Sequence, residues 1–115
     1  MLVFVYGTLK TGHRLHEHLA GAEFLGKAIT RPCYRMFQLG WYPGMVECDA
    51  GVAIEGEVWR VTDRTLAVLD EVEEVASGLY ERRPVQLGGE FNQMVVESYL
   101  FLGDVSGAED CGNCW

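Results

Sequence analysis

The sequence predicts an α+β domain in which six or seven strands and two short helices form a small mixed β-barrel or a highly curved sheet. Most of the chain divides into short extended segments separated by turns, and only two segments have the apolar spacing of a helix. The chain has 115 residues, of which 49% are hydrophobic, enough for one core but not for two. So many strands in so short a chain are expected to curve around that single core.

The first strand is expected over residues 2–6, where five apolar residues are typical of a strand buried on both faces. It stops at Gly7, and residues 8–12 connect it to a short helical pattern over residues 13–20 that Gly21 ends. Because Gly7 has no Cβ, the backbone can turn there, and the amides that follow can point at one spot. The loop is therefore either a cradle for an anion or oxyanion, or a plain strand–loop–helix connection.

Short extended segments and turns follow the first helical pattern. Residues 22–29 and 33–39 are expected to be strands with a bend between them at residues 31–32. A turn is expected at Tyr42-Pro43-Gly44, before a short strand that includes Met45 and Val46. These segments would supply one side of the curved sheet.

Residues 52–61 give the clearest strand signal, because small or aliphatic side chains alternate with Glu and Trp. One face carries Val52, Ile54, Gly56 and Val58, and the other carries Glu55, Glu57 and Trp59. Thr62 or Asp63 is then expected to cap a helix that runs to about Val75. We interpret Glu57, beside Trp59, as a structural residue.

Two further strands complete the predicted domain. Residues 80–87 and 93–102 are expected to form an antiparallel pair joined through Gly88-Gly89. The folded domain is thus assigned to residues 1–102. Residues 103–115 are rich in Gly, Asp and Ser and are expected to form a loosely held C-terminal tail.

Glu73 lies on an unexpected face of the helix that begins near Asp63. At about 100° per residue, one side of this helix is apolar: Thr65, Leu66, Val68, Leu69 and Val72. The opposite side is expected to be solvated: Arg64, Ala67, Glu71 and Glu74. Glu73 follows Leu69 by one turn and lies at the edge of the apolar stripe, where a carboxylate must be paired, hydrogen-bonded or partly protonated. A salt bridge to Arg82 or Arg83, or a frayed helix end, would explain it without any function.

Charge and cysteine content exclude several classes of function. The formal charge is −8 and there is no basic stripe, so neither nucleic acid nor an anionic membrane surface is an expected partner. No apolar run approaches the roughly 20 residues of a membrane-spanning helix, and the N-terminal run is too short for a signal peptide. We therefore expect a soluble, cytoplasmic protein whose four cysteines stay reduced.

Four short motifs together resemble one known superfamily. They are Tyr6-Gly7-Thr8-Leu9, Gly56-Glu57-Val58-Trp59, Leu69-Asp70-Glu71-Val72-Glu73 and Leu79-Tyr80-Glu81-Arg82. In this order and spacing they resemble the gamma-glutamylcyclotransferase-like superfamily, which includes plant avirulence-induced proteins and gamma-glutamylamine cyclotransferases. The likeness extends from Leu2 to about Leu102, and no part of it covers Cys111 or Cys114.

The resemblance implies a cavity lined by the Tyr-Gly-Thr-Leu loop and one catalytic Glu, which corresponds to Glu73. It implies a reaction in which the α-amine of a γ-glutamyl group attacks its own γ-carbonyl, forming 5-oxoproline and releasing an amine or amino acid. Glu73 would act first as general base and then as general acid, and no metal or organic cofactor is expected. The family often has Gly soon after this Glu, whereas here Glu74 follows and is a competing assignment.

Other residues receive expectations of differing kinds. Residues 6–9 are expected to bind substrate, with Tyr6 as a wall and the loop amides as donors to a carboxylate or oxyanion. The hydroxyl of Tyr80 would either bind the glutamyl part or belong to an aromatic residue packed in the barrel. Arg82 would pair with Glu73, hold a substrate carboxylate or stay exposed. Residues 42–44 are expected to shape the cavity.

Three other motifs give weaker signals. Residues 7–12 begin like a phosphate loop, but His13 and Arg14 stand where Lys and Ser or Thr are required. His13, His16 and His18 share one short segment, but His18 lies on a different helical face from the other two, so no metal site is expected. Cys111 and Cys114 form a single Cys-x-x-Cys pair without a second pair at matching spacing.

Two alternatives to a cyclotransferase remain open at this point. One is a non-catalytic module that binds a small metabolite on the same barrel, and the other is a metal-handling or interaction protein that works through the tail. The leaving amine or amino acid and the oligomeric state are not determined by the sequence.

Overall fold

The structure, a computed structural model, describes all 115 residues and contains one α-helix, two short 3₁₀ helices and eight strands. The strands are β1 (Leu2–Val5), β2 (Glu23–Ile29), β3 (Tyr34–Gln38), β4 (Pro43–Glu47), β5 (Glu55–Arg60), β6 (Tyr80–Pro84), β7 (Glu97–Phe101) and β8 (Glu109–Asp110). The helices are η1 (His16–Leu19), α1 (Asp63–Val72) and η2 (Gly89–Phe91).

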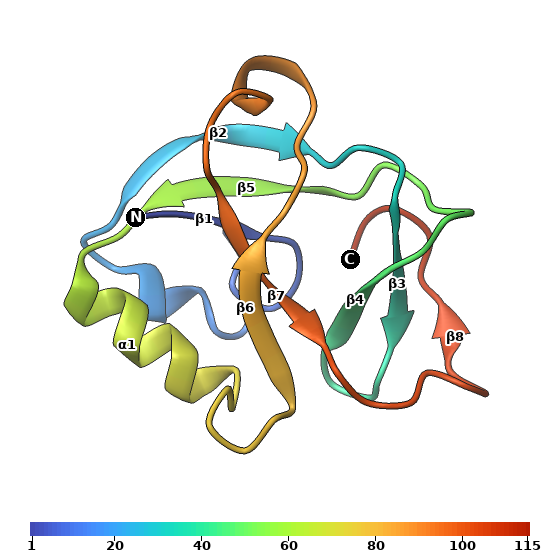
Figure 1. The fold of residues 1–115 in the computed structure, drawn as a ribbon. Helices are drawn as coiled ribbons and strands as arrows, with labels where there is room; N and C mark the ends of the chain where they lie inside the picture. The colour runs from blue at the N-terminus through green and yellow to red at the C-terminus, as the bar shows by residue number, and fades with distance from the viewer.

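All eight strands belong to one mixed sheet that curls into a half-barrel (Figure 1). Its order is β2-β5-β1-β7-β4-β3-β8, with β6 paired to β7 outside this path. Neighbours pair antiparallel except where β7 meets β1 and β4, and each of these parallel contacts has a single register pair. The predicted α+β class with a curved mixed sheet is confirmed, with eight strands rather than six or seven because the two-residue β8 is added.

The sheet has a core on each of its faces, and β1 contributes to both. Phe4 belongs to a cluster inside the curl, whereas Val3 and Val5 belong to a cluster beneath α1 and η1. Figure 1 shows α1 and η1 beside the N-terminal strands, at lower left. All three β1 side chains are 0–2% exposed, so the prediction that this strand is buried on both faces is confirmed.

Two local predictions are wrong. The expected helix over residues 13–20 is only the one-turn η1, because residues 10–15 form successive turns in which the Leu15 amide donates to the Thr8 carbonyl. The expected turn at residues 42–44 lies earlier, since Pro43 and Gly44 already belong to β4 and Gln38 pairs with Pro43.

Several further boundaries differ from the sequence prediction. Strand β1 ends at Val5 rather than residue 6, and β6 and β7 are shorter than the expected ranges 80–87 and 93–102, with η2 between them. Strand β5 begins at Glu55, later than the expected residue 52. Helix α1 begins as expected, with the Thr62 side chain accepting from the Thr65 amide at 3.1 Å. It ends at Val72 rather than Val75 because Glu74 has a φ of 52°, in the left-handed region, where a helix cannot continue.

The C-terminal segment contacts the rest of the fold at several points. Strand β8 pairs with β3, and Arg35 forms a 2.9 Å ion pair with Asp110. The amide of Glu55 donates to the carbonyl of Asn113, and Trp115 packs against the inner core. Residues 103–115 thus have more contacts than their composition indicates, while the domain boundary at residue 102 stays a prediction.

A membrane-spanning helix would have to be far longer and more apolar than α1, and none of the helices in the structure meets that requirement.

Candidate active site

A small cavity lies where the chain leaves β1, between the start of β4, the start of β6 and the end of α1. Its volume is about 20 Å³, which is room for one water-sized group. Its lining residues are Phe4, Val5, Tyr6, Gly7, Thr8, Leu9, Tyr42, Pro43, Glu73, Tyr80 and Tyr99. All six residues predicted for the site, namely Tyr6, Gly7, Thr8, Leu9, Glu73 and Tyr80, are therefore brought together here.

An open groove of about 520 Å³ adjoins this cavity. The two spaces share Thr8, Tyr42, Glu73 and Tyr80 as lining residues. Glu73 thus lies between a niche for a single small group and a groove large enough for the rest of a small-molecule ligand.

Glu73 reaches this position as the residue that caps the C-terminus of α1. Its backbone amide donates to the Leu69 carbonyl at 2.9 Å, which fixes it one turn beyond the buried Leu69. Its carboxylate has no hydrogen bond or ion pair with the protein. Burial raises the pKa of the Glu73 carboxyl from 4.5 to about 7, while the positive charge of Arg14 lowers it. The group can therefore accept and release a proton near neutral pH.

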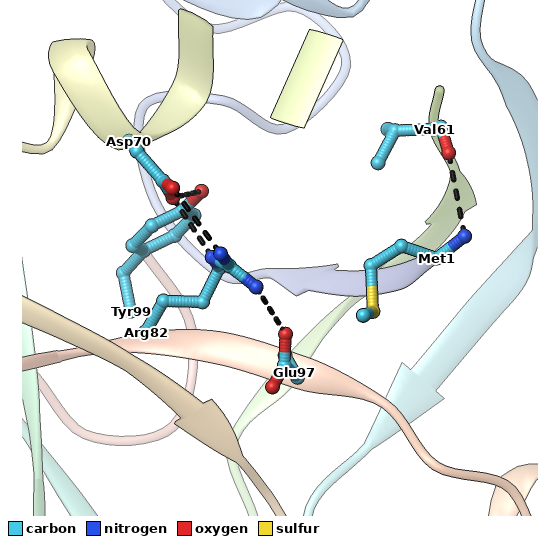
Figure 2. A network of polar contacts seen from close by, with 6 residues as sticks. All are labelled: Met1, Val61, Asp70, Arg82, Glu97 and Tyr99. Carbon is cyan, nitrogen blue, oxygen red and sulfur yellow. Dashed lines mark hydrogen bonds and ion pairs between the residues drawn. The ribbon is translucent and has the colours of Figure 1, made fainter. Parts of the chain in front are cut away.

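The two arginines proposed as partners of Glu73 are engaged elsewhere. Arg82 binds Asp70 through Nε at 2.9 Å and also pairs with Glu97 (Figure 2). Arg83 pairs with Glu47 at 2.8 Å. The interpretation of Glu73 as one half of a salt bridge with either arginine is therefore wrong.

Asp70 connects the helix that carries Glu73 to the sheet. Its Oδ1 accepts from the Tyr99 hydroxyl at 2.7 Å as well as from Arg82, and Figure 2 shows both side chains converging on it. Since Tyr99 also lines the cavity, this cluster fixes the last turn of α1 against β6 and β7. Sequence reasoning missed both Asp70 and Tyr99; the available signal was the spacing of Asp70, four residues after Leu66, at the edge of the apolar stripe of α1.

In the loop after β1, the backbone carbonyls accept hydrogen bonds within the protein, whereas the backbone amides of residues 7–9 donate none. The Gly7 carbonyl accepts from the Lys10 amide at 3.0 Å, and the Thr8 carbonyl accepts from the Leu15 amide at 2.8 Å. The amides of Gly7, Thr8 and Leu9 donate to no protein acceptor, although Thr8 and Leu9 are buried. Because unpaired buried amides are rare, this stretch has the donors that an anionic group requires.

Gly7 is required at its position by a close approach rather than by an unusual backbone conformation. A Cβ built on Gly7 would lie 2.5 Å from Cγ of Pro43. Gly7 does not have a positive φ, so the expected use of this glycine to permit a turn is not what its backbone shows. The β1 loop and the start of β4 can therefore pack together only if residue 7 has no side chain.

Tyrosine hydroxyls hold the cavity walls together. Tyr6 donates to the Tyr99 carbonyl at 2.7 Å and accepts from the Met45 amide, and Tyr80 donates to the Pro43 carbonyl at 2.6 Å. Burial raises the pKa of both phenols, so they are neutral near pH 7. The hydroxyl protons of Tyr6 and Tyr80 are thus already used within the protein.

Several other candidate residues lie outside this cavity. His16 packs on Trp59, with its Nδ1 3.0 Å from the Leu9 carbonyl, and no group of three His, Cys, Asp or Glu residues is arranged to hold a metal ion. Glu57 accepts from the Trp59 indole and from Thr11. A separate cleft of about 580 Å³ lies on the other side of the loop, beside β5 and η2, and none of the predicted site residues lines it.

Comparison with known proteins identifies the family. The model of the family described as "Gamma-glutamyl cyclotransferase, AIG2-like" matches residues 3–113. A Vibrio cholerae relative, provisionally named a gamma-glutamylcyclotransferase, is 47% identical over 74 residues, which are 64% of this chain and 63% of that protein. The alignment therefore spans less than two thirds of that relative's length.

Solved structures agree with the family assignment. The solution structure of Escherichia coli protein ytfP is 29% identical, with a TM-score of 0.74 over 99% of this chain and 93% of that one. A mouse AIG2-like protein is 24% identical, with a TM-score of 0.74 over 89% and 76% of the two chains, and this likeness concerns the fold alone. The chain belongs to the AIG2-like gamma-glutamyl cyclotransferase family, so the predicted family is confirmed, and this membership supports an enzyme of that kind.

Proposed function

We propose that this protein is a gamma-glutamylcyclotransferase that converts a γ-glutamyl amine or γ-glutamyl amino acid to 5-oxoproline and a free amine or amino acid. The observation that carries the proposal is the position of Glu73. It has a desolvated carboxylate without a protein partner, a pKa near 7, and a place between the niche and the groove. Family membership supports the same reaction.

In the proposed reaction, Glu73 takes a proton from the substrate's α-ammonium. The freed amine attacks the γ-carbonyl carbon of the same molecule, and the bond from that carbon to the leaving nitrogen then breaks. Glu73 returns this proton to the departing nitrogen and takes up the second proton that the attacking nitrogen loses as the lactam forms. It passes that proton to the freed amine, which leaves as an ammonium ion, so the carboxylate is regenerated at each turnover. Attack within one molecule needs no second reactant, and holding the glutamyl chain folded supplies much of the acceleration.

The unpaired amides of Gly7, Thr8 and Leu9 would bind an anionic part of the substrate. The niche has room for one small group, which suits the oxyanion that develops at the γ-carbonyl or one end of the substrate's α-carboxylate. Tyr6 and Tyr80 would form walls rather than exchange protons, because their hydroxyls are bound within the protein. Neither a metal ion nor a cofactor is part of this mechanism.

The test is to incubate the protein with a panel of γ-glutamyl amines and dipeptides and to measure 5-oxoproline by mass spectrometry. The wild type should form 5-oxoproline from at least one member, and Glu73→Gln should not. Glu74→Gln is the matched control, because Glu74 is the neighbouring exposed carboxylate, and this variant should keep its activity. Loss of product in Glu74→Gln with retention in Glu73→Gln would transfer the catalytic role to Glu74.

A second candidate is a binding module without catalysis, which the small volume of the inner cavity favours. Such a module would be stabilised thermally by 5-oxoproline or glutamate, to the same extent in the wild type and in Glu73→Gln, and would form no product across the panel. Product formation that depends on Glu73 would exclude it. The cytoplasmic location and the domain boundary at residue 102 remain proposals.

A further inference from the structure

The groove outside the Glu73 cavity combines an apolar wall with a small number of charged groups. Its apolar lining consists of Leu15, Trp41, Tyr42, Val72, Leu79 and Tyr80. Trp41 is 84% exposed. Such an exposed indole is unusual unless another molecule packs on it. The charged lining consists of Arg14, Glu73 and Glu74, and His18 adds an imidazole.

Arg14 is the one arginine in this groove, and it has no partner. Four other arginines of the chain, Arg35, Arg60, Arg82 and Arg83, form ion pairs with carboxylates. Arg14 forms no hydrogen bond or ion pair with the protein, although its charge is close enough to Glu73 to lower the pKa of that carboxyl. Its guanidinium is therefore free to bind a planar anion that enters the groove.

We propose that Arg14 binds a carboxylate on the leaving group, so that the preferred substrates are γ-glutamyl amino acids rather than γ-glutamyl amines. This inference rests on the proposed function, because it concerns the part of the substrate that the cyclisation releases.

The position of the scissile bond leads to this assignment. The departing nitrogen must lie at Glu73, because that carboxyl returns the proton to it. In a γ-glutamyl amino acid, the carbon bound to this nitrogen carries a carboxylate, which must therefore lie within a few bonds of Glu73. The glutamyl part is directed toward the niche, so the carboxylate lies on the groove side, where Arg14 is found.

The other charged groups of the groove are compatible with a bound carboxylate. The imidazole of His18, which also lines the groove, can donate a hydrogen bond to it. Glu73 is half-neutralised near its pKa of about 7, and Glu74 is exposed, so bulk water and salt screen its repulsion. The side chain of Arg14 is exposed, so with an amine leaving group, which has no anion to offer, its guanidinium would stay bound to water.

Arg14 takes no part in the exchange of bonds. The carbon–nitrogen bond of the lactam forms, the carbon–nitrogen bond to the leaving amino acid breaks, and the two protons lost by the attacking nitrogen pass through Glu73 to the departing nitrogen. The carboxylate held by Arg14 is the same anion before and after the reaction, so the residue determines specificity and does not transfer a proton.

The experiment is a competition between γ-glutamylalanine and γ-glutamylethylamine, which differ only by the carboxylate on the leaving group. Both are mixed with the protein, and released alanine and ethylamine are measured by mass spectrometry, giving the ratio of the two kcat/KM values. The wild type should prefer γ-glutamylalanine by about tenfold to a hundredfold, the range expected for one charge-assisted hydrogen-bonded pair. Within one sample, any change in folding or in the pKa of Glu73 affects both substrates alike.

Three variants sharpen the result. Arg14→Gln should reduce the preference to about twofold or less, because it removes the charge-assisted pair, and Arg14→Lys should retain part of it. Arg64→Gln removes the same charge from an exposed arginine without an ion pair on the far end of α1, and it should keep the wild-type ratio.

Two failures are distinguishable. If the wild type forms 5-oxoproline from both substrates at equal efficiency, or if Arg14→Gln keeps the wild-type ratio, the inference about Arg14 is wrong while the proposed function stands. If the wild type forms no 5-oxoproline from either substrate or from any member of the panel, the proposed function fails and the inference fails with it.

Discussion

Glu57 on β5 is buried and Glu73 at the end of α1 is half-buried, but only Glu57 has hydrogen-bond donors. Glu57 is 9% exposed, and its Oε1 accepts from the Thr11 amide at 2.9 Å, the Thr11 hydroxyl at 3.2 Å and the Trp59 indole at 3.1 Å. Glu73 has no donor, and burial raises the pKa of its carboxyl to about 7.

The difference teaches that burial alone does not give a carboxylate its role. Where donors replace water, as at Glu57, the carboxylate links the loop after β1 to the sheet. Where nothing replaces water, as at Glu73, the group lowers its free energy by binding a proton, and it becomes available for proton transfer. The four predictions that follow test this contrast, beginning with the largest expected effect.

Exchange of each carboxylate for its amide should separate activity from stability. Glu73→Gln should reduce 5-oxoproline formation by about 10²- to 10⁴-fold, the usual contribution of a general acid–base group, with no loss of stability. Glu57→Gln should instead lower the free energy of unfolding by about 1–3 kcal/mol, because a neutral amide oxygen is a weaker acceptor for these three donors than a carboxylate oxygen. Turnover by mass spectrometry and urea unfolding measure the two effects. If Glu57→Gln folds but is as inactive as Glu73→Gln, the assignment of a structural role to Glu57 and a catalytic role to Glu73 would be contradicted.

Glu73 should make a contribution to stability that falls as pH rises from about 4.5 to about 7. In the folded state the pKa of Glu73 is raised from 4.5 to about 7, so in this range the unfolded chain loses its proton while the folded chain keeps it. Ionisation then opposes folding, by at most about 3 kcal/mol above pH 7. Urea unfolding at several pH values, compared with Glu73→Gln, isolates this contribution. Identical pH dependences of the two proteins would contradict it.

Gly7→Ala should lower the free energy of unfolding by about 1–3 kcal/mol, because its Cβ would overlap Pro43. Gly88→Ala is the matched control, since a Cβ there would meet only Ile29 at 3.9 Å and the backbone is extended. It should change stability by less than about 0.5 kcal/mol. Thermal unfolding measures the stability of both variants. Equal losses of stability would show that the contact between the β1 loop and Pro43 does not require a glycine at residue 7.

The smallest effect is expected from a change at Asp70, which lies one turn before Glu73 and accepts hydrogen bonds from Arg82 and Tyr99. Asp70→Asn should cost about 1–2 kcal/mol by weakening the bonds from Arg82 and Tyr99. The more exposed ion pair between Arg60 and Glu23 is the control, and Glu23→Gln should cost less than about 0.5 kcal/mol. If the cluster also positions Glu73, the apparent pKa in the pH–rate profile should shift in Asp70→Asn and not in Glu23→Gln. An unchanged profile would limit Asp70 to a structural role.

The parts of the site that carry a local pattern or a family motif could be predicted from the sequence. Helical spacing placed Glu73 at the edge of the apolar stripe, which depends only on the chain's own periodicity. The roles expected for Glu73, residues 6–9 and Tyr80 came from the resemblance to a known family. The structure brings these residues into one cavity.

The parts that depend on topology could not be predicted in this way. Tyr99 reaches the cavity because β7 lies parallel to β1, a pairing between distant segments with no short-range signal. Arg14 was expected to lie on a helix, but turns place it in the groove. The end of α1 at Glu74 could not be predicted either, since the positive φ of this non-glycine residue has no signal in the sequence.

The most direct test of the contrast between the two carboxylates is a site-resolved NMR titration of the glutamate side-chain carboxyl carbons. Glu73, assigned by the signal that disappears in Glu73→Gln, should titrate near pH 7. The account predicts this inflection in the free protein, before any substrate is identified. A Glu73 signal that titrates near pH 4.5 would show that water or an undetected donor satisfies the carboxylate, and it would contradict the role proposed for this residue.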